Sequence, residues 1–209
     1  TDTEDMFRGV PLSQLVGRVK AIDVNAALPR HRSQIQKHVL KQICTISEIQ
    51  ELTGLIRRGT FSPPMDLPEG EVGIPLTWVY LAKSDDQGSG MYKKMKGRLA
   101  VRGDLQQGKI DKFEAYSPVA HPVSFRLLLT LHMGDPTVHM CKYDVTQAFL
   151  SSQQKRLVFV KHPPGYKIVQ GEKSLYYVAL EPEEKQPKTV MQLYLALYGG
   201  IECSRLYWE

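Results

Sequence analysis

The chain has 209 residues, of which 42% are hydrophobic and 9% aromatic, a composition that excludes an intrinsically disordered chain and predicts a folded core. Lysine and arginine number 27 against 22 acidic residues, and the net charge of +5 allows an anionic partner without establishing one. No apolar run approaches the roughly 18 residues of a membrane span, and no apolar signal segment opens the chain. We therefore expect an intracellular protein with no membrane partner.

The first predicted helix runs from residue 46 to 58. Thr45 and Glu48 have the spacing of a capping box, in which each side chain bonds a free amide of the first turn. The apolar residues of one face are Ile49, Leu52 and Ile56. Gly59 supplies a stop after the last turn. Apolar residues at helical spacing between 35 and 46 indicate a further amphipathic stretch upstream.

A hairpin is predicted next, with strands at 77–82 and 98–102 and a polar turn at 84–90. The basic residues at its rim are Lys83, Lys93, Lys94, Lys96, Arg98 and Arg102. Such cations can neutralise a polyphosphate or a nucleic-acid backbone, and they can equally form a solvated face. The turn lacks the third glycine and the following helix of a dinucleotide-binding fingerprint, and the chain has no Walker loop.

The second half of the chain mixes helical and strand patterns. Pro122 marks a helix start, and residues 125–131 are predicted to form a buried helix. Strands are expected over 138–145 and 157–160, and a last apolar stretch runs from 190 to 198. Helices combined with hairpins predict an α+β fold.

Asp144 is the first candidate for chemistry, because it closes the expected strand 138–145 where a carboxylate can meet solvent and cations. A strand-end aspartate is also a common turn cap, so the position alone has two interpretations. The three cysteines, Cys44, Cys141 and Cys203, are dispersed and odd in number, which argues against a disulfide scaffold or a structural zinc site. We therefore expect a reduced chain.

Six short segments occur in a fixed order along the chain. They are Gly59-Thr-Phe-Ser-Pro63, Lys96-Gly-Arg-Leu-Ala-Val-Arg-Gly103, Tyr116-Ser-Pro-Val119, Asp144-Val-Thr-Gln-Ala-Phe-Leu150, Pro163-Pro-Gly-Tyr166 and Leu197-Tyr-Gly199. In this order and near this spacing they resemble the reverse transcriptase domain of copia-type retrotransposons. The resemblance covers roughly residues 46–208 and places Asp144 at the start of polymerase motif A.

The resemblance implies the fingers and an incomplete palm of a right-hand polymerase, an antiparallel sheet with packed helices. It also implies RNA-directed DNA synthesis with two Mg²⁺ (or Mn²⁺) ions, an RNA template, a DNA primer and dNTP. Asp144 would be catalytic and would bind metal together with the backbone carbonyl of Val145. The residues implied to hold the nucleotide are Lys83, Arg98, Val145, Phe149, Tyr198 and Gly199. Those implied to bind nucleic acid are Lys93, Lys94, Lys96 and Arg102.

The expected organisation has three parts: 1–45 as a linker or upstream region, 46–132 as a fingers-like region, and 133–209 as a partial palm. An upstream integrase and a downstream RNase H would complete a polyprotein, in a cytoplasmic particle or the nucleus. The family's Tyr-x-Asp-Asp hairpin is missing, since Asp144 is the last aspartate of the sequence. We expect a fragment that stops before this motif and is inactive by itself, because one carboxylate holds two Mg²⁺ ions poorly. The alternative is a catalytically inactive remnant or a basic nucleic-acid-binding module.

Overall fold

The computed structural model describes residues 28–38, 40–84, 92–106, 117, 120–135, 137–139, 141, 143, 145, 148–181 and 184–208. The helices are α3 (Arg32–Ile35), α4 (Lys41–Arg57), α6 (Pro122–His132) and α7 (Cys203–Trp208), with 3₁₀ turns η2 (Gly103–Leu105) and η3 (Ala148–Ser151). The strands are β1 (Gly73–Ile74), β2 (Leu76–Ser84), β3 (Tyr92–Val101), β4 (Phe159–Lys161), β5 (Tyr166–Gln170), β6 (Leu175–Ala179) and β7 (Val190–Gln192). None of the described helices is long and apolar enough to cross a membrane.

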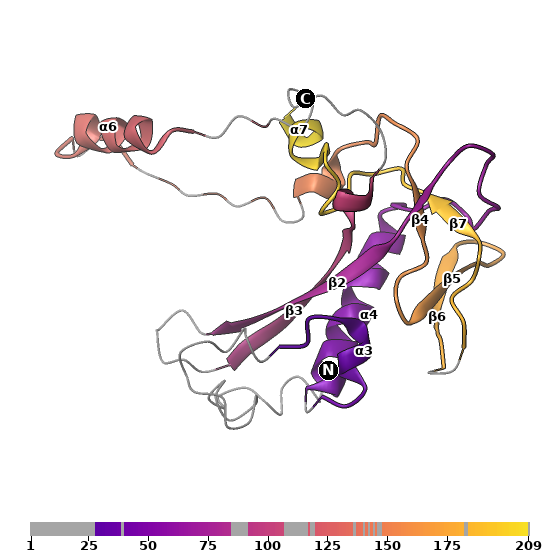
Figure 1. Cartoon of the computed structure of the whole chain (residues 1–209). Coiled ribbons are helices and arrows are strands. Elements are labelled where there is room, and N and C mark those ends of the chain that lie inside the picture. The colour runs from indigo at the N-terminus through magenta and orange to yellow at the C-terminus, as the bar shows by residue number, and fades with distance from the viewer. Residues whose placement is uncertain are drawn as a thin grey trace.

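The strands form three small sheets. β2 and β3 make a long antiparallel hairpin, β5 and β6 a shorter one, and β1, β4 and β7 a three-stranded sheet in which β1 runs parallel to β4. Helix α4 lies between the two hairpins (Figure 1) and contacts β3 on one side and β6 on the other. This mixture of helices and mainly antiparallel strands confirms the predicted α+β class.

Helix α4 begins at Lys41, earlier than the predicted start at residue 46. Thr45 lies inside the helix, where its Oγ1 donates a hydrogen bond to the carbonyl oxygen of Lys41 at 2.9 Å. The predicted capping box is therefore wrong, and burial of Ile43 in the core explains why the helix extends towards its N-terminus. The predicted stop is confirmed, because Gly59 follows the helix with a φ of +69°.

The core forms where α4 packs on the β2–β3 hairpin. Trp78 of β2, Leu99 of β3 and Leu52 of α4 are at most 2% exposed. Residues alternate along β2, so Trp78 faces the core while Val79 faces solvent. Fully burying side chains of this size contributes roughly 1.5–3 kcal/mol each to folding, so this packing fixes the hairpin against α4.

Residues 28–44, which precede the resemblance, contribute to the same core. Leu28, Ile35 and Leu40 are at most 5% exposed and belong to one cluster of buried residues with the hairpin. The short helix α3 places Arg32 against that cluster. The described structure thus includes a packed segment upstream of residue 46.

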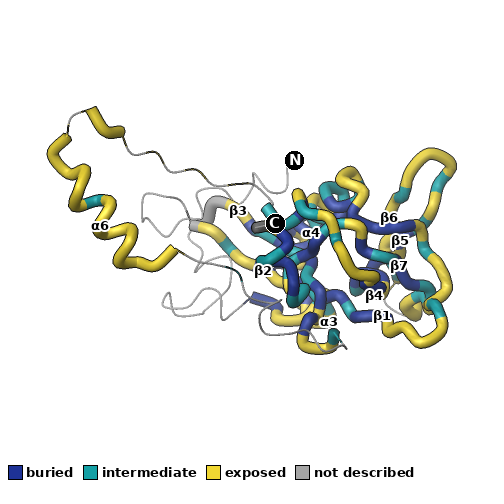
Figure 2. The backbone as a smooth tube through the Cα atoms, turned by 90° about the horizontal axis from the view of Figure 1, so that it is seen from above, coloured by how far each residue is buried: buried dark blue, intermediate teal, exposed yellow. Residues whose placement is uncertain are grey.

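Helix α6 corrects the prediction of a buried helix at 125–131. Its start is as expected, with Pro122 in the first turn and the His121 side chain accepting a hydrogen bond from the Val123 N–H at 3.3 Å. None of its residues is buried, however, and Leu131 is 69% exposed. Figure 2 shows α6 exposed along nearly its whole length and apart from the other elements. An apolar sequence predicts a helix that needs a partner surface, and the described part of this chain provides none.

The expected strand at 138–145 is also not found among the residues of this segment that the structure describes. Its described residues, 138, 139, 141, 143 and 145, lie in no strand. Tyr143 is 88% exposed and Val145 is 55% exposed, so neither side chain packs against a sheet. A β-rich sequence forms a strand only where a neighbouring strand accepts its backbone hydrogen bonds, and none of the described strands pairs with the described residues of this segment.

Candidate functional site

The end of β3 is joined to the turn at 197–200. The N–H of Val101 donates a hydrogen bond to the carbonyl oxygen of Tyr198 at 2.7 Å. Gly199 follows with a φ of +81°. A β-carbon on Gly199 would overlap the carbonyl oxygen of Val101, and a β-carbon on Gly103 would overlap that of Gly199. Two glycines therefore permit a backbone approach that larger residues would block.

Next to this junction, a cation and three aromatic rings contact one another in a row. The Arg98 guanidinium is 5.0 Å from the centre of the Tyr198 ring. The Phe149 ring meets Tyr198 edge to face, with centroids 5.4 Å apart, and meets Tyr207 of α7 in the same way at 6.2 Å. Each such ring pair contributes roughly 0.5–1.5 kcal/mol beyond the area that it buries. The cluster holds the hairpin, η3 and α7 together.

The electrostatics of this cluster favour binding an anion at Arg98. Burial raises the pKa of the Tyr198 hydroxyl, while the nearby Arg98 charge opposes that effect. The Nε of Arg98 is buried and makes no hydrogen bond to a described residue, although the Arg98 charge also acts on the Glu51 carboxylate and opposes the rise of its pKa. A buried cationic donor without an acceptor is costly, so an anionic ligand that reaches Nε would be stabilised there.

The structure brings together four of the residues that the resemblance assigned to the nucleotide: Arg98, Phe149, Tyr198 and Gly199. They come from three segments that are distant in sequence. Lys83 is not part of this cluster. It pairs with Lys94 across the hairpin, whereas Arg98 pairs with Val79, and four residues along a strand correspond to about 13 Å.

The remaining residues assigned to nucleic acid lie in different environments. Lys94 is exposed on β3 and Lys96 is half-buried. The Lys93 side chain lies outside the described residues. Arg102 is exposed and binds Asp104 with two hydrogen bonds of 2.9 and 2.7 Å, which lowers the pKa of that aspartate. Arg102 is therefore already paired with a carboxylate. Both side chains are exposed to solvent, so this ion pair is weak and can open.

Asp144, the expected catalytic residue and metal ligand, lies outside the described residues. Within the residues that the structure describes, no three histidine, cysteine or acidic side chains come together. Glu202, the acidic residue just before α7, pairs instead with Arg156, with a nitrogen–oxygen distance of 3.0 Å. Divalent ions such as Mg²⁺ need several oxygen ligands, so the described side chains do not fit a metal site.

A buried polar cluster centred on Glu48 was not predicted from the sequence. The Glu48 carboxylate has no exposed surface and accepts hydrogen bonds from the hydroxyls of Tyr80 and Tyr166, the second at 2.7 Å. Arg32 Nε lies 2.9 Å from the same carboxylate, and its guanidinium lies 5.3 Å from the Tyr166 ring centre. Gly165 makes room for it, since a β-carbon there would lie 2.8 Å from Arg32 Cζ.

The hydrogen bonds and the cation around Glu48 partly offset the cost of burying its carboxylate. Burial raises the pKa of Glu48, and the hydrogen bonds from both tyrosines and the Arg32 charge oppose that rise. Burial also raises the pKa of Tyr80 and Tyr166, which therefore remain donors. The sequence does contain a signal for this cluster, because Glu48 lies on the apolar side of the predicted helix. The capping-box interpretation gave Glu48 a different role.

Residues 63–200 match the family model described as "Reverse transcriptase (RNA-dependent DNA polymerase)". The chain belongs to this family. The predicted resemblance to copia-type retrotransposons is confirmed, and the matched range includes β1–β7, η3 and all four clustered residues. Helices α3 and α4 lie upstream of the matched range.

Curated relatives of this reverse transcriptase domain are retrotransposon polyproteins. The chain is 27% identical over 140 residues to the "Retrovirus-related Pol polyprotein from transposon TNT 1-94" of Nicotiana tabacum, covering 67% of this chain and 10% of that protein. It is 26% identical over 162 residues to the polyprotein from transposon RE2 of Arabidopsis thaliana, covering 78% of this chain and 10% of that protein. The matched part thus spans about a tenth of the length of these relatives. No solved structure gives a significant match.

Proposed function

We propose that this chain forms part of the RNA-directed DNA polymerase of a copia-type retrotransposon polyprotein. The observation that carries the proposal is the cluster of Arg98, Tyr198 and Phe149, which lies within the family-matched residues and presents a buried cationic donor. In this role the chain acts inside the cell on an RNA template, a DNA primer and dNTP. Integrase and RNase H domains accompany it in the polyprotein.

In the proposed site, Arg98 binds the triphosphate of the incoming nucleotide. Its fixed position over the Tyr198 ring means that little reorganisation is needed when negative charge develops during phosphoryl transfer. Phe149 packs under the sugar and limits the space beside the 2′ position. Gly199 keeps the turn close to β3, so that the Tyr198 ring borders the same pocket.

Asp144 and the backbone carbonyl of Val145 are the proposed ligands of Mg²⁺ or Mn²⁺. Bound divalent ions would align the primer 3′-hydroxyl with the triphosphate and neutralise its charge. The described residues add no second carboxylate to these ligands. We assign residues 46–132 to the fingers and 133–209 to a partial palm, with 1–45 upstream. In that division, the segment 28–44 packs against the fingers.

Photo-crosslinking of a radiolabelled dNTP tests the nucleotide site directly. Arg98→Ala should lower crosslinking by about tenfold, because a charge-assisted contact contributes roughly 1.5 kcal/mol or more. Arg57→Ala removes an exposed arginine from the last turn of α4 and is the matched control. Equal crosslinking by Arg98→Ala and the unchanged chain would contradict the proposed site.

RNA-templated primer extension tests the polymerase activity. In the polyprotein, incorporation should be abolished by Asp144→Asn and reduced by Arg98→Ala. The chain by itself should show none with Mg²⁺ or Mn²⁺. Incorporation by the polyprotein that survives Asp144→Asn would exclude the proposed role of motif A.

The second candidate is a basic nucleic-acid-binding module without catalysis. It is favoured by the exposed Lys83 and Lys94 at one end of the hairpin and by the lack of a carboxylate cluster among the described residues. Primer–template binding without any incorporation in the polyprotein would select this candidate.

A further inference from the structure

Glu51 of α4 lies where the helix packs closely against β3. Ser47, one turn earlier on the same face of α4, approaches Gly97 so closely that a β-carbon there would lie 2.7 Å from the Ser47 Oγ. The Glu51 carboxylate reaches further along β3 and accepts a hydrogen bond from the backbone of Leu99. Glu51 is therefore held next to Arg98, which lies between Gly97 and Leu99 in β3.

Glu51 also lines an open pocket of about 310 Å³ between α4 and the β2–β3 hairpin. The other lining residues are Ser47, Gln50, Lys83, Lys94, Lys96 and Gly97. The pocket thus sets the Glu51 carboxylate among three lysines, on the side of β3 that α4 covers. It gives water and protons a route to this side chain.

The charges of Glu51 and Arg98 act on each other, and both side chains are half-buried. Burial raises the pKa of Glu51, and the hydrogen bond from the β3 backbone with the charges of Lys96 and Arg98 opposes that rise. Burial also raises the pKa of the Tyr198 hydroxyl, where the charges of Arg98 and Arg58 act against the rise and the charge of Glu51 adds to it. Glu51, Arg98 and Tyr198 therefore share one electrostatic environment, although they come from three separate segments.

Glu51 and Arg98 each keep one buried atom that makes no hydrogen bond to a described residue, Oε1 and Nε respectively. Oε1 can accept a proton, and Nε can donate a hydrogen bond to an anion. A cation that is balanced by a fixed carboxylate attracts a further anion less strongly, because the two negative charges repel each other. The carboxylate and an anionic ligand therefore compete for the charge of Arg98.

We propose that Glu51 is a positioning residue of the nucleotide site, and that its carboxylate balances the charge of Arg98 until a triphosphate replaces it. The inference rests on the proposed function for the identity of the ligand. Once the triphosphate lies at Arg98, Glu51 faces a negative charge, and its Oε1 takes up a proton from solvent. Helix α4, upstream of the family-matched residues, thereby sets the affinity of the site.

Glu51→Gln tests this role, because it removes the charge and keeps an oxygen that can accept the hydrogen bond from β3. The concentration of radiolabelled dNTP that gives half-maximal photo-crosslinking should fall about fivefold at pH 7.5, the size of one partly exposed charge interaction. No fall in Glu51→Gln would overturn the proposal, and so would a rise.

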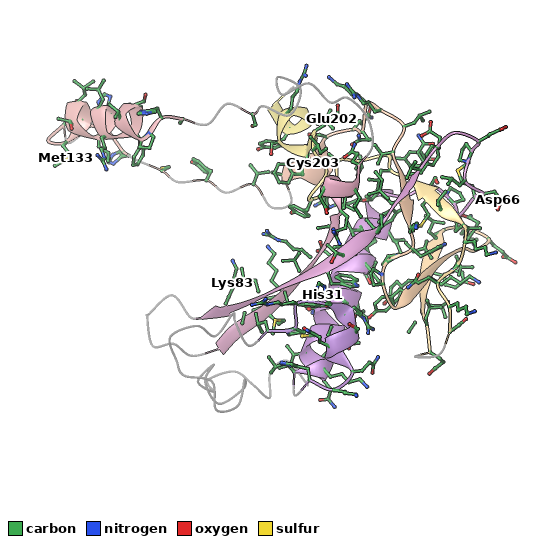
Figure 3. The ribbon with its side chains drawn as sticks, viewed as in Figure 1. His31, Asp66, Lys83, Met133, Glu202 and Cys203 are labelled. Atoms are coloured by element: carbon green, nitrogen blue, oxygen red, sulfur yellow. The ribbon has the colours of Figure 1, made fainter. Side chains whose placement is uncertain are left out.

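Asp66→Asn is the matched control, because it removes one negative charge from an exposed loop position. Figure 3 shows Asp66 well apart from the hairpin arm that carries Lys83. The half-maximal dNTP concentration should change by less than about twofold, since solvent and salt screen a distant exposed charge. An equal fall in Asp66→Asn and Glu51→Gln would overturn the proposal, because it would reflect net charge alone.

The pH profile separates a charge effect from a packing effect. A protonated Glu51 has the same charge as glutamine, so the advantage of Glu51→Gln should shrink as pH is lowered from about 8 to about 5.5. The dNTP phosphates titrate as well, but they do so equally in both proteins. An advantage that is independent of pH would assign the effect to packing and overturn the proposal.

A double-mutant cycle tests whether Glu51 acts through Arg98. In an Arg98→Ala background, Glu51→Gln should change the half-maximal dNTP concentration by less than about twofold. The full fivefold gain in that background would show that the carboxylate repels the triphosphate directly, and it would overturn the proposal.

Calorimetry with inorganic tripolyphosphate distinguishes this inference from the proposed function. Titrations in two buffers of different ionisation enthalpy measure proton uptake on binding, which should be larger for the unchanged chain than for Glu51→Gln, and equal uptake would overturn the inference. If dNTP crosslinking fails while this difference remains, the polymerase proposal fails and the role of Glu51 at an anion site stands. If Arg98→Ala lowers crosslinking but Glu51→Gln changes nothing, the nucleotide site stands and the role of Glu51 fails.

Discussion

Arg32 lies 2.9 Å from the buried carboxylate of Glu48, and this ion pair ties the upstream segment 28–38 to the core. Glu48 in turn accepts hydrogen bonds from the hydroxyl groups of Tyr80 in β2 and Tyr166 in β5. One side chain of α4 thus connects the upstream segment with both hairpins. The segment that precedes the family-matched range is therefore part of the structure that supports the candidate site.

Replacing Arg32 should destabilise the fold strongly. Arg32→Met keeps an apolar stem but leaves the Glu48 carboxylate buried without a cation, which costs roughly 3–5 kcal/mol in free energy of unfolding. Arg57→Met, on the exposed end of α4, should stay within about 1 kcal/mol. Urea unfolding followed by circular dichroism measures both values. A loss below about 1 kcal/mol for Arg32→Met would show that the two tyrosines suffice to hold the carboxylate.

His162 should make stability depend on pH. Its Nδ1 accepts the Ile168 N–H at 3.0 Å, so Nε2 carries the proton that faces the Thr189 hydroxyl at 2.9 Å. Burial lowers the pKa of His162 to about 4, with Lys167 adding to the effect. The unfolded chain binds a proton below a pH of about 6.5 that the folded chain does not accept until about pH 4, so stability falls as pH drops through that window.

The loss from His162 should reach up to about 3 kcal/mol at pH 4, because each pH unit of difference between the two pKa values corresponds to about 1.4 kcal/mol. Urea unfolding between pH 7 and pH 4 measures it. His162→Gln should be less stable at pH 7 but should show a weaker dependence on pH. His132→Gln, on the exposed face of α6, should leave the dependence unchanged. The same pH dependence in all three proteins would assign it to other groups.

Gly199→Ala should lower the free energy of unfolding by more than the positive φ alone explains. Both Gly199 and Gly70 have φ near +81°, but only Gly199 lies against other backbone, at Val101. Gly70→Ala should therefore cost about 1 kcal/mol, and Gly199→Ala about 3 kcal/mol or more. Thermal unfolding of both variants compares them. Equal losses would mean that the turn moves away from β3 without cost.

Substitutions on α6 should have little effect on stability. Leu131 is 69% exposed, so Leu131→Gln should change the free energy of unfolding by less than about 0.5 kcal/mol. Leu99 in β3 is fully buried, and Leu99→Ala should cost about 2–5 kcal/mol. Urea unfolding measures both variants. A large loss for Leu131→Gln would show that α6 is covered in solution.

Several elements followed from local patterns. The hairpin of 77–82 with 98–102 is confirmed within β2 and β3, since alternating apolar residues specify a strand with one buried face. The end of the first helix at Gly59 is confirmed because the positive φ there suits glycine. The predicted burial of α6 was wrong, and so was the predicted strand at 138–145 as far as its residues are described. An apolar pattern indicates that a segment needs a partner, but it does not show whether that partner lies beside it.

The candidate site shows the same division. The family could be predicted from short segments in a fixed order, because each segment is recognised from its own few residues. The sequence proposed Arg98, Phe149, Tyr198 and Gly199 separately, by resemblance, and their predicted roles stay predictions. Only the tertiary structure placed the Arg98 guanidinium over the Tyr198 ring and separated Lys83 from it along the hairpin.

What the sequence alone determined is therefore the family, the α+β class and the basic hairpin. Tertiary structure decided that Glu48 is buried, since Tyr166 lies 118 residues away from it along the chain. It also decided that α4 forms one wall of a lysine-lined pocket. The physical reason is that periodicity and turn chemistry act over a few residues, whereas the partners of a buried charge are set by how distant elements pack.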